Sequence, residues 1–395
     1  MKHTMSRYAF YSLTVTFTIL SVLGQVSTSI YSPFFFDLAT LYASQVSIIE
    51  QSVAVFLVAF SLSQLASGIA CDYVNKQKFL FYGIIVFIAG TLMVALAHDQ
   101  ATFLTGRVVQ GLGGGVGVSV SRGLSRQIFS EKQLNTSLSL INIAFAIAPA
   151  IAPLVGTIIG ESLGISAIFY FVLVMGLLAL FSLFSVSNIL SGFMPPISDN
   201  VFSNTLVLIK STIMKLVSVG MASGLLYGIV FCFITIAPSM VMQQFGLSKT
   251  LFSIYSLLAT LSFVAGSVLN IRLTSLSPFQ KFRVSSFCLA ALSVLFALTV
   301  FSSSQSGLVS ILAYCYIAFF FIGIAMPCSV TIMLGYSETS AGFLAALTGF
   351  FHLTGAAIGA YVVTLLTLEP TEAFSLATCA LSIASIAICF TLKKH

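Results

Sequence analysis

Charged residues are almost absent from this chain, and their scarcity constrains the fold more than any other feature. Only 7% of the 395 residues are Asp, Glu, Lys or Arg, against roughly a quarter in ordinary soluble proteins. Apolar residues make up 58%, and the mean hydropathy is +1.09. A water-soluble fold of this length needs a charged exterior to stay dispersed. The outer surface is therefore predicted to face the hydrocarbon of a lipid bilayer.

Long apolar stretches follow one another along nearly the whole chain. A helix needs about 20 apolar residues, each rising about 1.5 Å, to cross a bilayer. The sequence predicts twelve such helices, and the fold class is therefore all-α integral membrane. The predicted spans are 9–32, 47–70, 78–97, 101–121, 135–159, 164–187, 214–241, 250–270, 283–303, 307–333, 340–366 and 372–391.

Lys and Arg are distributed unevenly between the two ends of these spans. With the N-terminus in the cytoplasm, all of them fall on the cytoplasmic side except Lys249, which lies outside, and Arg107, which lies within a span. This is the bias described by the positive-inside rule. Both termini are therefore expected in the cytoplasm. The net charge of +6 follows from the same bias and does not indicate nucleic-acid binding.

Residue patterns for metal, nucleotide or catalytic chemistry are missing from the sequence. The seven cysteines are scattered singly, so neither a metal site nor disulfides are expected. No G-x-x-x-x-G-K-[ST] loop for ATP occurs. The four histidines are far apart, and no clustered acids lie within the spans. We therefore expect no cofactor and no enzymatic activity.

The longest connection, near residues 188–213, divides the helices six and six. We expect an N-terminal bundle at 1–190, a cytoplasmic linker at 191–213 and a C-terminal bundle at 214–395. Several features recur in register, including a proline after the first helix of each half (Pro33 and Pro238). Duplicated halves are common among transporters.

One cytoplasmic loop resembles a signature of the major facilitator superfamily. Its residues Gly68, Asp72 and Lys76 match the pattern G-x-x-x-D-R-x-G-R-K, although Tyr73 and Asn75 replace the usual Arg and Gly. The resemblance implies that Gly68 allows close helix approach and that Asp72 holds the halves in one access state. The alternative is an ordinary basic loop.

The fourth helix carries Arg107-Val-Val-Gln110-Gly111, which closely resembles the R-x-x-Q-G motif of the same superfamily. A buried arginine is costly in a bilayer and normally faces a cavity or a partner. Snorkelling to the outer interface is the alternative. Arg107 and Gln110 are predicted to bind substrate.

The fifth helix is similar to the proline- and glycine-rich motif of drug:proton antiporters of the Bcr/CflA-like subfamily. It contains Pro149, Pro153 and Gly156. Each proline removes a backbone hydrogen bond and bends the helix. The bend is expected to shape a cavity wall, although a plain kink is the alternative.

The first helix departs from that subfamily at one position. Ser29 stands where these antiporters carry an acid that the resemblance connects with proton coupling. A serine cannot carry the proton, so the candidates are His352, Asp37 and Glu50. His352 lies within a predicted span, and a neutral, hydrogen-bonded histidine is an equal alternative. Asp37 and Glu50 flank an outer loop, where simple surface charges are favoured.

Polar, uncharged side chains complete the predicted binding cavity. Gln25 and Ser29 share one face of the first helix, and Asn142 and Tyr227 join them from other helices. Such a cavity suits a moderately lipophilic small molecule, with any anionic group on Arg107.

The resemblance implies a secondary active transporter in the bacterial inner membrane. It would export a solute by rocking of two halves, with proton antiport as the energy source. The alternative is an importer or uniporter of a small metabolite on the same fold. We expect a monomer whose partners are the solute, protons and the bilayer.

Overall fold

The computed structural model describes residues 5–70, 74–193, 201–302, 307–336 and 341–391. Within them the chain is almost entirely helical and contains no strand. The α-helices are α1 (Arg7–Ser29), α2 (Phe35–Leu41), α3 (Val46–Ala70), α4 (Lys76–Ala95), α5 (Gln100–Ile128), α6 (Glu131–Leu163), α7 (Ile165–Ser185), α8 (Ser187–Ser191), α9 (Val201–Pro238), α10 (Lys249–Arg272), α11 (Pro278–Ser302), α12 (Leu308–Leu334), α13 (Ala341–Leu365) and α14 (Pro370–Thr391), with short helices η1 (Ser32–Phe34) and η2 (Ser239–Gln244).

The predicted all-α membrane architecture is confirmed. Ten described helices are long and apolar enough to span a bilayer, and the bent helix α6 brings this to 11. Helix α5 completes the set of twelve. It has 29 residues, about 43 Å at the usual rise, but its glycines and arginines make it less apolar.

Two boundaries differ from the predicted ones by more than about five residues. Helix α5 continues to Ile128, past the predicted end at residue 121, because nothing in 122–128 breaks a helix and Phe129 closes its last turn onto Ser125. Helix α9 begins at Val201, inside the predicted linker 191–213. The linker residues 194–200 lie outside the described part of the chain.

Side-chain caps explain where several helices begin. Asp99 accepts a hydrogen bond from the Thr102 amide at 2.9 Å and so caps α5. This bond and others from the same turn lower the pKa of the Asp99 carboxyl. Ser130 and Gln133 form a capping box at the start of α6. These caps satisfy amide groups that have no partner within the helix.

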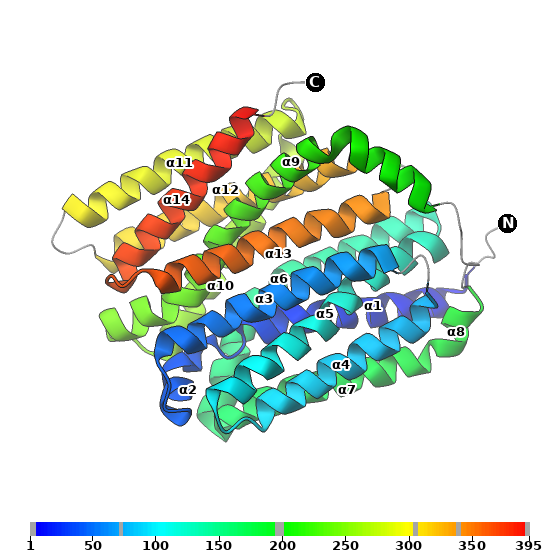
Figure 1. Ribbon diagram of the computed structural model, residues 1–395, viewed down its shortest axis with the longest axis horizontal. Coiled ribbons are helices and arrows are strands. Elements are labelled where there is room, and N and C mark those ends of the chain that lie inside the picture. The colour runs from blue at the N-terminus through cyan, green and yellow to red at the C-terminus, as the bar shows by residue number, and fades with distance from the viewer. Residues whose placement is uncertain (1–4, 71–73, 194–200, 303–306, 337–340, 392–395) are drawn as a thin grey trace.

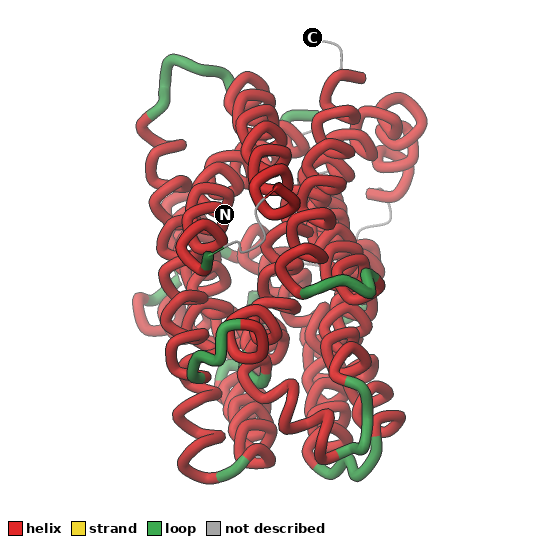
Figure 2. The backbone as a smooth tube through the Cα atoms, turned by 90° about the vertical axis from the view of Figure 1, so that its left-hand side faces the viewer, coloured by secondary structure: helices red, strands yellow, loops and turns green. Residues whose placement is uncertain are grey.

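The helices run roughly along the long axis of the molecule and form two groups that lie beside each other (Figure 1). Helices α1 and α3–α7 form one half, and α9–α14 form the other (Figure 1). Figure 2, which looks onto the left-hand end of Figure 1, shows that helices joined by loops make up the described part of the chain. Across the boundary, α3 packs on α13 and α6 packs on α10.

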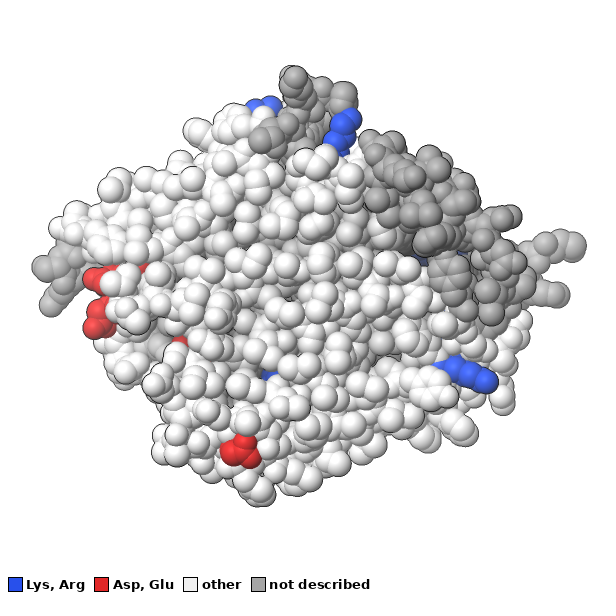
Figure 3. Space-filling model, viewed as in Figure 1, with Lys and Arg blue, Asp and Glu red and all other residues white. Residues whose placement is uncertain are grey.

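The two ends of the bundle differ in charge. We call the end with Asp37, Asp99 and Glu372 the acidic end, and the end with Arg126 and Arg272 the basic end. The space-filling view shows acidic side chains toward the left and basic ones toward the right and top (Figure 3). The wide surface between them is almost uncharged, as expected for a face in contact with lipid.

Glycines bring α9 and α13 into backbone contact within the second half. Gly224 and Gly228 face Gly355 and Gly359, and a Cβ atom on Gly228 would lie 2.6 Å from the carbonyl oxygen of Gly355. A Cβ on Gly355 would collide with the backbone of Gly224. Paired small residues at four-residue spacing allow this close approach in membranes.

Replacing Gly355 with valine is expected to separate α9 from α13 and to destabilise the protein by about 1–3 kcal/mol. The measurement is the yield of monodisperse protein in detergent and its thermal midpoint. The control is Gly335→Ala, because a Cβ there meets its nearest neighbours at an ordinary 3.4 Å. Equal behaviour of the two variants would contradict the proposed backbone contact.

Candidate solute cavity and its gates

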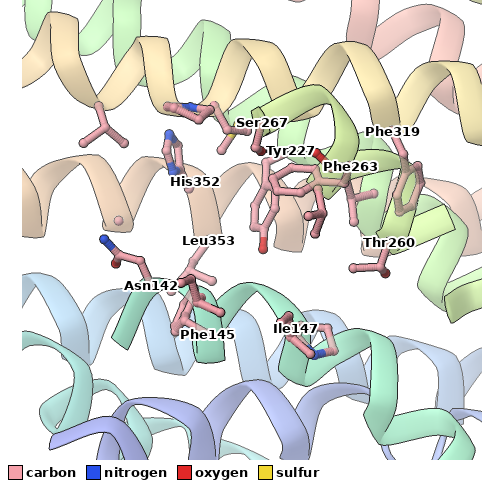
Figure 4. Close-up of a pocket in the computed structure, with 18 of the residues that line it drawn as sticks. Asn142, Phe145, Ile147, Tyr227, Thr260, Phe263, Ser267, Phe319, His352 and Leu353 are labelled. Carbon is pink, nitrogen blue, oxygen red and sulfur yellow. Dashed lines mark hydrogen bonds between the residues drawn. The ribbon is translucent and has the colours of Figure 1, made fainter. Parts of the chain in front are cut away.

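A cavity of about 770 Å³ lies between the two halves. Helices α5 and α6 form one wall, and α9, α10, α12 and α13 form the others. In the close-up, Asn142 and Phe145 of α6 face Tyr227 of α9 and His352 of α13 across the open space (Figure 4). The size and mostly apolar lining are typical of a site for a small organic molecule.

Five of the predicted site residues line this cavity: Asn142, Tyr227, His352 and the two prolines of α6, Pro149 and Pro153. The Nε2 atom of His352 lies 3.1 Å from the Ser329 hydroxyl, and its ring is 6.0 Å from that of Tyr227. The Oδ1 atom of Asn142 accepts a hydrogen bond of 3.3 Å from Arg122. His352 is thus both hydrogen-bonded and cavity-facing.

Two arginines of the cavity wall, Arg122 and Arg126, were not predicted to line it. Both were expected on the cytoplasmic side, beyond the predicted helix end at residue 121. Their spacing of four residues, in a stretch without proline, was the signal that α5 carries both on one face.

Arg107 lies away from the cavity wall, in the core of the first half. Its side chain is 1% exposed and donates hydrogen bonds to the Ser27 carbonyl oxygen at 2.9 Å and to Gln110 Oε1 at 2.5 Å. Its guanidinium also lies 4.3 Å from the centre of the Phe56 ring. The alternative of snorkelling does not occur, since the side chain is buried among α1, α3 and α5.

Gln110 and Gln25 are also buried and are likewise not among the cavity-lining residues. Gln110 donates to Thr91 at 2.9 Å. Both amide atoms of Gln25 are buried and have no hydrogen-bond partner among the described residues. The predicted polar residues therefore fall into a set that lines the cavity and a set that is buried outside it.

Ser29 holds the bent part of α6. Segments Glu131–Phe145 and Ile147–Leu163 are inclined by 40°, as the prolines at 149 and 153 predict. Pro153 has no amide hydrogen, which leaves the Pro149 carbonyl without its helical partner. The Ser29 hydroxyl donates to that carbonyl at 3.3 Å. The residue in place of the subfamily's acid thus satisfies an acceptor freed by a proline.

Replacing Ser29 with aspartate is expected to destabilise the protein at neutral pH, because an ionised carboxylate cannot donate to the Pro149 carbonyl. The expected cost is about 1–3 kcal/mol. A protonated aspartic acid can donate, so the thermal midpoint of Ser29→Asp should recover between about pH 8 and about pH 5. The control is Ser29→Asn, which has a similar shape and no charge, and whose midpoint should not share this recovery. Parallel pH profiles for the two variants would refute the assignment.

Contacts between the halves close the acidic end. Glu50 is 4% exposed, and its Oε1 atom accepts a hydrogen bond of 2.6 Å from Ser239 of η2. Lys249 at the start of α10 forms an ion pair of 2.8 Å with Asp37 of α2. Thr157 of α6 and Ser253 of α10 are hydrogen-bonded at 2.9 Å. Each contact joins one half to the other.

The expectation of simple surface charges was wrong for Glu50. Its side chain is buried because η2, which follows α9 in the second half, covers it. Asp37 is partly exposed, but it takes part in an ion pair between the halves. Neither partner could be predicted, because Ser239 and Lys249 lie far along the chain from Glu50 and Asp37.

Two glycines among the predicted conformational residues, Gly68 and Gly156, lie at close contacts between helices. A Cβ on Gly68 would collide with Ala346 of α13, so Gly68 marks a close contact between the halves. Lys76 is buried at the start of α4, and Asp72 lies outside the described residues. Gly156 of α6 packs directly against the carbonyl oxygen of Ile30.

The family model described as Major Facilitator Superfamily matches residues 17–391. The chain therefore belongs to the Major Facilitator Superfamily, which confirms the resemblance seen in its motifs. The crystal structure of a D-xylose-proton symporter shares the fold, with a TM-score of 0.72, 14% identity, and coverage of 96% of this chain and 97% of that one. A bacterial homologue of the lysosomal transporter Spinster, solved inward-facing and unoccupied, gives a TM-score of 0.71 at 11% identity, covering 98% of this chain and 96% of that one.

Curated relatives include proteins named for drug resistance. Multidrug resistance protein D of Escherichia coli is 25% identical over 143 residues, which are 36% of each chain. A bicyclomycin resistance protein homolog of Haemophilus influenzae is 25% identical over 261 residues, 65% of each chain. The matched segment thus spans about a third of the first relative and just under two thirds of the second. These names agree with the predicted Bcr/CflA-like resemblance.

Proposed function

We propose that this protein is a proton-coupled antiporter that exports a small, moderately lipophilic solute across the bacterial inner membrane. The observation that carries this is the cavity between two halves whose acidic end is closed by paired side chains. Alternating access requires such a cavity with a gate on each side. The drug-resistance names of the relatives favour export over uptake.

The orientation follows from the positive-inside rule. With the basic end and both termini in the cytoplasm, the closed acidic end faces outward. The cavity extends toward the basic end, where the lining includes Arg126 of α5 and Ile271 of α10. The structure then corresponds to a state that takes up solute from the cytoplasm. The proposed working unit is a monomer of two bundles, and the second bundle begins with α9 at Val201.

Glu50 is the residue we assign to proton coupling in place of the missing acid on the first helix. It is buried between the halves, and among the described residues no cation pairs with it. An isolated charge is costly to bury. The two halves therefore close over Glu50 more readily when its carboxyl group is protonated, and they separate more readily when it is ionised. Its position at a contact that alternating access must break links the proton to the conformational change.

Everted membrane vesicles test the proposed function. Respiration acidifies their interior, which an acridine dye reports as quenching, and an exported solute should release protons and restore fluorescence. Bicyclomycin and a panel of lipophilic acids, amides and amines serve as probes. Recovery should exceed that in vesicles without the protein, which report the passive effect of each probe on the pH gradient. Uphill transport that ignores both uncouplers and external pH would exclude antiport and favour an importer or uniporter.

A further inference from the structure

The cavity wall carries positive charge and no compensating acid. Arg122 and Arg126 of α5 line it, and no carboxylate occurs among the described lining residues. The other polar lining residues, such as Tyr227 and His352, bring no carboxylate to balance the two arginines. The described cavity wall is therefore electropositive.

Arg122 is only partly satisfied by the protein. It donates to Asn142 at 3.3 Å and lies 5.1 Å from the centre of the Phe145 ring. Its Nε atom is buried and has no hydrogen-bond partner among the described residues. Neither an amide oxygen nor an aromatic face neutralises a guanidinium, so Arg122 presents an unpaired positive charge to the cavity. An anion entering the cavity would pair with it.

The rest of the cavity is suited to an apolar body. Aromatic and aliphatic side chains dominate, including Phe231, Phe263 and Phe319, with Tyr227, Thr260 and Ser267 as scattered polar groups. The volume of about 770 Å³ admits a drug-sized molecule. The combination of one strong cationic site with a large apolar wall selects for an amphipathic solute.

We propose that the exported solute is a lipophilic organic anion whose carboxylate or similar acidic group pairs with Arg122. Arg126, one turn further toward the basic end, attracts the anion to the cavity from the cytoplasm. The buried Arg107 serves the structure of the first half instead. This inference rests on the proposed function, because it takes the cavity as the place where the solute binds.

Equilibrium binding to the purified protein tests the inference without any need for transport. The probes are 1-naphthaleneacetate, its primary amide and 2-(1-naphthyl)ethylamine, which share one aromatic body and differ in charge. Isothermal calorimetry in detergent should show the acid binding at least about tenfold tighter than the amide and the amine. Arg122→Gln should abolish this preference and leave the affinity for the amide unchanged, while Arg122→Lys should retain part of it.

Arg283→Gln is the matched control, since Arg283 lies on α11 beside Phe279 and Phe390 and away from the cavity. It should keep the preference for the acid. The inference is overturned if the amine binds as well as the acid, if no acid binds, or if Arg122→Gln weakens all three probes equally. A preserved acid preference together with uncoupler-insensitive transport would instead overturn the antiport mechanism alone.

Discussion

Glu50→Gln is expected to abolish uphill, proton-driven export while leaving solute binding intact. Glutamine keeps an oxygen that can accept from Ser239, so the contact of 2.6 Å between the halves can persist. It cannot take up or release a proton, so the contact no longer responds to the proton gradient. In everted vesicles the solute-dependent recovery of dye fluorescence should fall to the level of vesicles without the protein. Exchange of labelled for unlabelled solute at equal concentrations should continue.

Two comparison variants make this result specific to Glu50. Asp37→Asn removes the carboxylate of the neighbouring ion pair with Lys249, and it should reduce export only modestly because the pair is partly exposed. His352→Gln removes the imidazole that lines the cavity, and this variant should retain proton-coupled export. Coupled export that survives Glu50→Gln but is lost in His352→Gln would assign proton coupling to His352 in the cavity instead of Glu50 at the acidic end.

The architecture could be predicted from the sequence because the bilayer imposes it locally. Each span is recognised from about 20 consecutive apolar residues. The bias of Lys and Arg indicates which end of the bundle faces the cytoplasm. The prolines at 149 and 153 predicted the bend in α6 because a missing amide hydrogen acts on its own helix. These features depend on residues close together in the chain.

The candidate site could be predicted only in part because its contacts join distant residues. Glu50 and Ser239 are 189 residues apart in the chain, and Ser29 and the Pro149 carbonyl are 120 apart. Nothing near Glu50 reveals that a segment of the other half covers it. The predicted end of the fourth helix also excluded Arg122 from the cavity, although the helix continues past it. The side of a helix that faces water, lipid or protein is decided by such packing.

Arg107 shows how the same motif can be located correctly and still be given a different role. The sequence predicted a buried arginine, and the side chain is buried. Its hydrogen bonds, however, are with the end of the first helix and with its own helix. Ser27 lies in the last turn of α1, where carbonyl groups commonly lack a partner within the helix. Arg107 therefore ties α5 to the end of α1.

Arg107→Ala is expected to reduce the stability of the protein strongly. Transport should then fall because less folded protein is present in the membrane. The change leaves the Ser27 carbonyl and the Gln110 side chain without their donor, at a cost of about 1–3 kcal/mol for each buried acceptor. The measurement is the thermal midpoint and the yield of monodisperse protein in detergent. Arg122→Ala is the matched control, because it removes a cavity arginine and should fold normally while losing its preference for the acid probe. Normal stability of Arg107→Ala combined with loss of that preference would return Arg107 to the binding site.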